Sequence, residues 1–237
     1  MEDLYVAKRQ GFRGLHCSAG ETRDKQGTNS KEEERMHWKH YRPAMIASAL
    51  LLACLLSLPT VGRAQTVSGQ GTAVQASVSS VLGTVTTVLA DTGVIGATNV
   101  EQDVGQDTGS VASLLNADVL SSSTYSYADE VDSLSSLGDL NMAVAGVSIT
   151  ADSVVAKASQ VLGAAGTGSA FVDNLAINGV PIFVTGDPNQ TVAIPGGQMV
   201  INEQTISSSG SALVNALHVT VNGVVDMVIA SATAGIS

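Results

Sequence analysis

The side chains best suited to chemistry in this sequence are two groups of closely spaced acids. One lies in a Gly-containing stretch near residue 105, and the other follows two tyrosines near residue 130. Calcium takes about six to eight oxygen ligands, and alternate carboxylates of a loop can supply several of them. Neither stretch has the spacing of an EF-hand or of a nonapeptide calcium repeat, so a solvated acidic loop is the competing interpretation. The candidate calcium ligands are Glu101, Asp103, Asp107, Asp129, Glu130 and Asp132.

Two tyrosines are the candidate glycan-binding residues. Exposed aromatic rings commonly hold sugars, and aromatic residues are scarce after residue 64. Tyr125 and Tyr127 are two positions apart, so they share one face if this segment is a strand.

No set of catalytic residues is recognisable after residue 64. A triad needs a histidine that converges with a nucleophile and an acid, and His218 is the single histidine of this part. Its apolar neighbours Leu217 and Val219 predict that His218 and Thr220 face outward from a strand, as solvated residues. The glycine-rich stretch 163–168 lacks the lysine of a phosphate-binding loop and is predicted to be a flexible loop. We therefore expect no catalytic residues and no small-molecule cofactor, with calcium as the one possible ion.

The composition changes abruptly near residue 64. Residues 1–64 hold ten of the eleven Lys and Arg, three of the four His and both Cys. The fifteen-residue stretch Ala44–Leu58 is apolar and uncharged, follows Lys39 and Arg42, and precedes small residues at positions 62 and 64. It is too short for a confident membrane span, which needs about 20 residues, but typical of a signal peptide. We predict a signal peptide at 36–64, cleavage after Ala64 and secretion to the extracellular space or cell surface.

The N-terminal sequence also allows alternatives to cleavage after Ala64. Cys54 lies in a stretch loosely similar to a lipobox, which would make the protein a lipoprotein, and an uncleaved anchor is a further possibility. Met36 directly precedes the signal, so residues 1–35 are expected to be a gene-model extension or a polar tail.

The 173 residues after position 64 carry one Lys, Lys157, against fourteen Asp and Glu, a formal net charge of −13. Nucleic acids and anionic membranes bind clustered Lys and Arg, so neither is an expected partner. Since this part contains no cysteine, disulfides do not stabilise it.

Turn and strand signals predict an all-β fold. Asn-Gly pairs at 178–179 and 222–223 lie between apolar runs, which is a strong hairpin signal. Segments beginning at Val131, Val172 and Val214 are similar and lie 41 and 42 residues apart, which suggests a repeated two-strand unit. We expect an antiparallel β-sandwich or open barrel built from repeated hairpins, with a β-solenoid as the alternative.

For the stretch 74–89, valines at helical spacing indicate a helix, whereas its β-branched composition indicates a strand. The sequence leaves this choice open.

Several segments resemble the bacterial choice-of-anchor P family, in particular 178–181, 186–191, 194–197 and 201–204, with 214–219 and 228–231 further along. The resemblance extends from about Ser110 to Gly235, so we expect an N-terminal strand and linker region at 65–109 and a β domain at 110–237. It implies a secreted surface protein of undefined molecular function, without catalytic residues to transfer. The sequence ends at Ser237 without an apolar helix or sorting motif, so free secretion or N-terminal lipidation is also expected.

The predicted function is that of an exported, non-enzymatic cell-surface or matrix protein, which associates with itself or with other surface proteins. A secreted module that binds a glycan or calcium is the alternative, and a secreted hydrolase ranks third.

Overall fold

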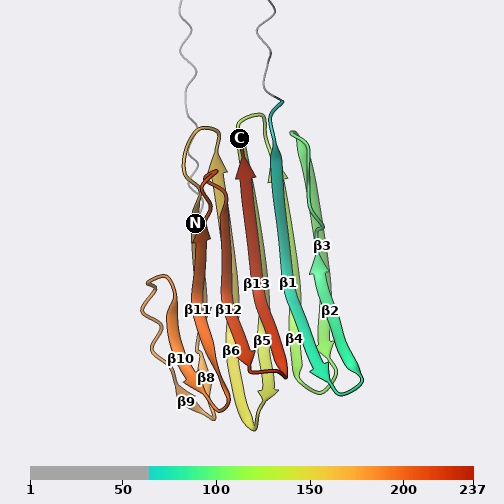
Figure 1. Ribbon diagram of the computed structural model, residues 1–237, viewed down its shortest axis with the longest axis vertical. Helices are drawn as coiled ribbons and strands as arrows, with labels where there is room; N and C mark the ends of the chain where they lie inside the picture. The colour runs from blue at the N-terminus through green and yellow to red at the C-terminus, as the bar shows by residue number, and fades with distance from the viewer. Residues whose placement is uncertain (1–63) are drawn as a thin grey trace, which may run out of the picture. The chain divides into compact units, whose positions relative to one another are not determined.

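A computed structural model describes residues 64–237, which lie in one compact unit (Figure 1). These residues form thirteen β-strands and no helix, arranged in two antiparallel sheets that are not closed into a barrel. The predicted antiparallel β-sandwich is therefore confirmed. The expected signal peptide, the tail at 1–35 and Cys54 lie outside the described residues, apart from Ala64 itself.

The first sheet, sheet A, has six strands in the order β10-β11-β12-β13-β1-β2. The chain's first strand lies inside this sheet, because β1 pairs with the last strand, β13, on one side and with β2 on the other. Residues 65–109, expected as an N-terminal strand and linker region, thus contribute to the same unit as the rest. The strands are β10 (Gln190–Ile194), β11 (Gly197–Ile206), β12 (Ala212–Val221), β13 (Val225–Ile236), β1 (Val67–Ser80) and β2 (Gly83–Asp91).

The second sheet, sheet B, has seven strands in the order β3-β4-β5-β6-β8-β9, with β7 also paired to β6. It covers the inner face of sheet A, so that alternate residues of both sheets form the core. The strands are β3 (Val100–Val111), β4 (Leu115–Ser126), β5 (Glu130–Val144), β6 (Val147–Val161), β7 (Thr167–Asp173), β8 (Ala176–Ile177) and β9 (Val180–Pro181).

Both Asn-Gly pairs lie at hairpin turns, as predicted. Asn178 and Gly179 have φ of 50° and 75°, the two positive values that a two-residue hairpin turn requires. At the other pair Val221 opposes Val225, so the turn has a third residue, and only Gly223 has a positive φ, 69°. The stretch 74–89, for which the sequence left the choice between helix and strand open, is a hairpin of β1 and β2.

The sequence repeat does not correspond to a structural repeat. Its first copy begins at Val131 near the start of β5, its second at Val172 near the end of β7, and its third at Val214 within β12. Asp132 accordingly lies inside a strand and Asp173 at a strand end.

A line of irregular residues crosses sheet A at mid-length. Ala90, Ala230 and Asn202 have positive φ of 45°, 53° and 52°, and Ala73 and Ala216 lie opposite them in the strands between. In β13 the buried positions change here from 225, 227 and 229 to 230, 232 and 234. Before the line the odd-numbered residues of β13 face the core, and after it the even-numbered residues do. At the line itself two consecutive residues, Ile229 and Ala230, are buried.

Sheet B has a matching line, at which two consecutive residues point outward instead. Val119 in β4 and Asp139 in β5 have positive φ of 50° and 47°, and the consecutive residues that are not buried are 118–119 in β4, 138–139 in β5 and 152–153 in β6. Bulges of this kind bend a strand and re-aim its side chains. The two lines divide the sandwich into two halves.

The halves have different cores. Large buried side chains such as Met142, Met199 and Met227 lie on the side of the β5–β6 turn. The half that holds the start of β1 and the end of β13 includes small core residues such as Gly71, Ser122 and Ala232, and the sheets approach closely there. A Cβ on Gly71 would lie 2.7 Å from the backbone oxygen of Leu134 in the opposite sheet.

Candidate functional site

The most organised polar cluster on the outer face of sheet A is built around His218. Its Nδ1 lies 2.9 Å from Oε2 of Glu203, and its Nε2 lies 2.9 Å from Oδ1 of Asp226. The three residues belong to neighbouring strands β11, β12 and β13. The side chain of His218 is 22% exposed, that of Glu203 30% and that of Asp226 66%.

Neutral polar side chains extend this cluster along the same face. The amide Nδ2 of Asn215 donates to Oε2 of Glu203 at 2.6 Å, and Oγ of Ser231 donates to Oδ1 of Asn215 at 2.7 Å. Glu203, Asn215 and Ser231 lie directly opposite one another in the strand register, so one row of hydrogen bonds joins β11, β12 and β13.

The chemistry of this cluster is that of a cross-link between strands. An ionised carboxylate only accepts hydrogen bonds, so both ring nitrogens of His218 donate only when the imidazole is protonated. Neither nitrogen is available to a serine hydroxyl in this arrangement, whereas a hydrolytic triad needs one nitrogen on the nucleophile.

His218 faces outward with Thr220, as predicted, but it is a partly buried, doubly bound residue rather than a solvated one. Its partners are 15 and 8 residues away in the sequence. The hairpin at Asn222-Gly223 predicts that the strands of His218 and Asp226 pair, but it is the third turn residue, Val224, that places Asp226 opposite Thr220 and diagonal to His218. The sequence analysis found no turn signal that would identify Glu203 as the other partner of His218.

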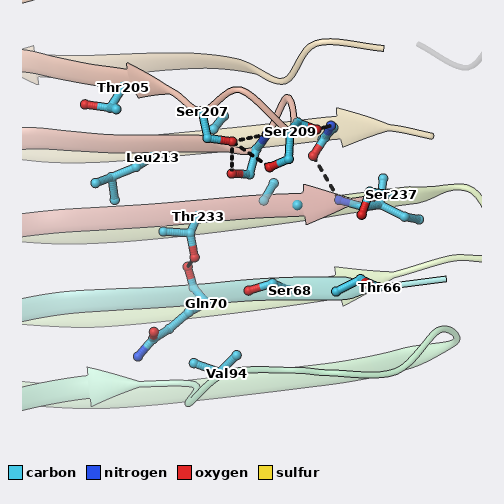
Figure 2. Close-up of a pocket in the computed structure, with 16 residues that line it drawn as sticks. Thr66, Ser68, Gln70, Val94, Thr205, Ser207, Ser209, Leu213, Thr233 and Ser237 are labelled. Carbon is cyan, nitrogen blue, oxygen red and sulfur yellow. Dashed lines mark hydrogen bonds between the residues drawn. The ribbon is translucent and has the colours of Figure 1, made fainter. Parts of the chain in front are cut away.

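A groove crosses the outer face of sheet A at the end of β13 and has a volume of about 410 Å³ (Figure 2). Residues from β1, β11, β12 and β13 line it, together with Gln160 of β6, Val94 after β2, the turn between β11 and β12 and the C-terminal residue. We call it the hydroxyl groove, because Ser and Thr dominate its lining: Thr66, Ser68, Thr205, Ser207, Ser209, Ser211, Thr233 and Ser237.

The hydroxyl groove contains no ionisable side chain and no aromatic ring. Ser207 forms its most connected part: its Oγ lies 2.6 Å from Oγ of Ser211 and 2.8 Å from Oγ of Ser209 (Figure 2). Below the groove, Oε1 of the buried Gln160 accepts from the backbone N–H of Ile236 at 2.9 Å. The groove thus offers neutral donors and acceptors on a rigid base.

The first predicted acidic group is not in a loop. Glu101, Asp103 and Asp107 lie on β3, the edge strand of sheet B, where their exposed side chains are spread along the strand. The second group spans a turn and the start of β5, with Asp129 in the turn and Glu130 and Asp132 in the strand. In residues 64–237 no three His, Cys, Asp or Glu side chains are grouped so that they could hold a metal ion.

The two predicted tyrosines lie at the end of β4, with Tyr125 half-buried and Tyr127 exposed. The phenol of Tyr125 donates to Oδ1 of Asp103 at 3.1 Å, and this hydrogen bond is the main reason that the pKa of Tyr125 is raised. Neither tyrosine lines the hydroxyl groove.

An acidic row that the sequence analysis missed follows the irregular line of sheet B. Five neighbouring strands, β3 to β7, each place one exposed aspartate on or beside that line. Asn174 donates to one of them, Asp152, at 2.7 Å. The residues of the row are Asp107, Asp118, Asp139, Asp152 and Asp173.

The two remaining sequence features are Lys157 and the glycine-rich stretch 163–168. Lys157 is exposed on β6, opposite Leu134 and Ser169. The stretch 163–168 forms the turn between β6 and β7 and then begins β7.

Comparison with protein-family models finds no match, and neither the curated proteins nor the solved structures yield a similar chain. The resemblance to the choice-of-anchor P family therefore stays a prediction. In the part of the chain that the structure describes, no helix has the length and apolar character needed to cross a membrane.

Proposed function

We propose that this protein is exported and acts outside the cell, at the surface or in the extracellular matrix, through non-covalent contacts and without catalysis. The observation that carries the proposal is the hydrogen bonding of His218. Both of its ring nitrogens face carboxylates at 2.9 Å, so neither is free to activate a nucleophile. The hydroxyl groove adds to this argument, because none of its lining side chains is an acid, a base or a charged group.

The chain around residue 64 supports export. Ala64 and Gln65 are exposed, and β1 begins at Val67, so cleavage after Ala64 leaves the strand intact. The backbone of Thr66 exchanges two hydrogen bonds with Ser237, of 2.8 and 3.0 Å, which would secure the new N-terminus. The composition break at the same point is the sequence basis of the proposal.

N-terminal sequencing of the full chain expressed in a bacterial host tests export. We expect the protein in the medium or on the cell surface to begin at Gln65, and Ala64→Arg to abolish this product because signal peptidases require a small residue there. Thr66→Arg is the matched control and should be processed normally. Protein retained in the cytoplasm, or a lipid-bearing Cys54 at the N-terminus, would contradict cleavage after Ala64.

The hydroxyl groove favours glycan binding as a second candidate function. Its neutral hydroxyl and amide groups match the donors and acceptors of an uncharged sugar chain, and none of its lining side chains carries a charge that would favour a charged ligand. Ser68 in β1 points outward into this groove, whereas Gln75 points outward from the same strand outside it.

Isothermal titration calorimetry with linear neutral glucan oligosaccharides tests this second candidate. We expect binding by the wild type, loss of binding in Ser68→Leu, and unchanged binding in Gln75→Leu. A wild type that binds none of these glucans, or a Ser68→Leu variant that binds as well as the wild type, would remove glucan binding at the groove.

A further inference from the structure

The exposed edges of the two sheets are protected to very different degrees. An unpaired edge presents free backbone N–H and C=O groups that can pair with another chain, and proteins usually block it with charge, proline or short length. On sheet B, β3 carries exposed acids, and β9 has only two residues, one of them Pro181. On sheet A, β10 has five residues and ends directly before Pro195.

The outer edge of β7 is covered by a side chain. Nε2 of Gln204, in β11, donates to the backbone oxygen of Gly168 in β7 at 3.1 Å. The same edge is held at its start by the turn after β11, because the N–H of Gly166 donates to the oxygen of Gly210 at 2.6 Å. Two of the backbone groups near this edge are therefore satisfied within the chain.

The edge of β2 has none of these protections. Residues 83–90 read GTVTTVLA, without a charged residue or a proline, and are rich in the β-branched residues that favour strands. The one acid of the strand, Asp91, stands at its end, where Gln70 and Thr72 both donate to its Oδ1. Of the two edges of sheet A, β10 also lacks charge within the strand but has five residues and is followed by Pro195, whereas β2 has nine residues and no charge before Asp91.

The free part of β2 is its distal half. Gly109 of β3 packs beside Leu89, since a Cβ on Gly109 would lie 3.0 Å from Cδ1 of Leu89. Before that point residues 83–86 and Val88 are exposed, and Val85 is 67% exposed although it points to the inner side of the sheet. The turn adds two further exposed apolar side chains, Val81 and Leu82.

We propose that a second copy of this chain pairs with the distal half of β2, edge to edge and antiparallel, so that sheet A continues from one copy into the other. An antiparallel pairing with Thr86 opposite Thr86 places Val85 opposite Thr87 and Thr84 opposite Val88, which keeps each pair on one face of the sheet. Such an interface is isologous, because the same residues face one another in both copies.

Charge favours a second copy at this edge over pairing at β3. The described part of the chain is strongly acidic, and β3 against β3 would bring the rows of Glu101 and Asp103 together. With Thr86 on the two-fold axis, the contacts between Gly109 of β3 and Leu89 lie on opposite sides of that axis in the two copies. The two acidic copies still repel each other across the interface. Salt screens this repulsion, over about 8 Å at physiological ionic strength, so association should strengthen as the salt concentration rises.

Sedimentation velocity of the full chain over a concentration and salt series tests the pairing, which does not depend on export. We expect a monomer–dimer equilibrium that shifts toward dimer as salt rises. Thr86→Lys and Thr86→Glu each place like charges across the axis, and each should lower the association constant about tenfold or more. The two changes shift the net charge in opposite directions, so a shared loss of dimer is specific to the site.

Thr191, exposed on the opposite edge strand β10, provides the matched control. Thr191→Lys and Thr191→Glu repeat both charge changes and should leave the association constant unchanged. Dimer loss at Thr191 and not at Thr86, or a monomer at every concentration and salt level, would overturn the proposal.

Hydrogen exchange of the unmodified chain gives a test that does not need a variant to fold. The amides of residues 83–88 should exchange more slowly at high protein concentration than at low concentration, whereas those of β10 should not change. Equal exchange of 83–88 at both concentrations, under conditions where dimer is present, would place the interface elsewhere and contradict the proposal.

Discussion

Ser133 and Thr233 join the two sheets: Oγ of Ser133 in β5 donates to the backbone oxygen of Thr233 in β13 at 2.6 Å. A side chain as short as serine reaches the opposite backbone because the sheets approach closely in this half of the sandwich. The neighbouring hydroxyls of Ser122 and Ser135, both fully buried, lie 2.9 Å apart and satisfy each other. The thin half of the core is thus partly polar, with its hydrogen-bonding groups paired.

Gly71→Ala should destabilise the protein strongly. The new Cβ would lie 2.7 Å from the oxygen of Leu134 and 3.2 Å from Cβ of Ser122, so the sheets would have to move apart. Overpacking of this kind costs about 1–3 kcal/mol, and thermal melting measures it. Gly105→Ala is the matched control, since its Cβ would meet nothing closer than 3.8 Å, and it should melt near the wild type. Equal melting of both variants would show that the sheets are not close at Gly71.

His218→Ala should reduce the free energy of unfolding by about 1 kcal/mol or more. The change leaves Glu203 and Asp226 without the ring that separates their charges, and most of the loss comes from the less exposed Glu203. Thr220→Ala removes an outward side chain two residues along β12 and should have little effect. Denaturant unfolding at neutral pH compares the two, and an equal small loss in both would mean that the cluster contributes nothing to stability.

Tyr125 should ionise at higher pH than an ordinary tyrosine. Its hydrogen bond to Asp103 raises its pKa above 10.0, with smaller effects from desolvation and from the charges of Asp103 and Glu101. The folded state therefore keeps this proton to higher pH than the unfolded chain. Its contribution to stability is present below the ordinary tyrosine pKa and is lost as pH rises through the raised one.

NMR titration of labelled tyrosine measures the pKa of Tyr125. Asp103→Ala should lower the pKa of Tyr125, whereas Asp107→Ala on the same strand should leave it where it is in the wild type. A pKa of Tyr125 that does not respond to Asp103→Ala would show that the hydrogen bond is absent in solution.

Asp139→Asn should raise the melting temperature slightly. The pairs Gly138–Ser153 and Leu140–Ala151 flank this position, so Asp139 lies opposite Asp152, and like charges opposite each other destabilise a sheet by some tenths of a kcal/mol. Asparagine also tolerates the positive φ of 47° at this residue. The gain should shrink at 1 M salt, where charges are screened within about 3 Å. A gain that is independent of salt would assign the effect to the backbone and not to charge.

The sequence was sufficient for the fold class and for the turn at Asn178-Gly179, because strand alternation and the residues that tolerate positive φ are local signals. It was insufficient for the irregular lines. Adjacent buried residues such as Ile229 and Ala230 interrupt the alternation of β13, and that interruption was the available sign.

Edge strands and side-chain clusters were harder to predict. β3 is exposed on both faces over most of its length, so its sequence lacks apolar alternation and was interpreted as loop. The partners of His218 depend on strand register, and Glu203 reaches it only through the pairing of β11 with β12. The register of that pairing depends on the turn 207–211, which the sequence analysis did not identify.

Incubation of the purified protein with extracellular polysaccharides and with a mixed peptide library, followed by detection of new reducing ends and new amines, tests the central claim most directly. Our account predicts no release above a heat-denatured control, because both nitrogens of His218 face carboxylates and no side chain that lines the hydroxyl groove is an acid or a base. Release that is lost in His218→Ala or Glu203→Gln, retained in Thr220→Ala, and accompanied by unchanged melting would contradict it and identify the cluster as catalytic.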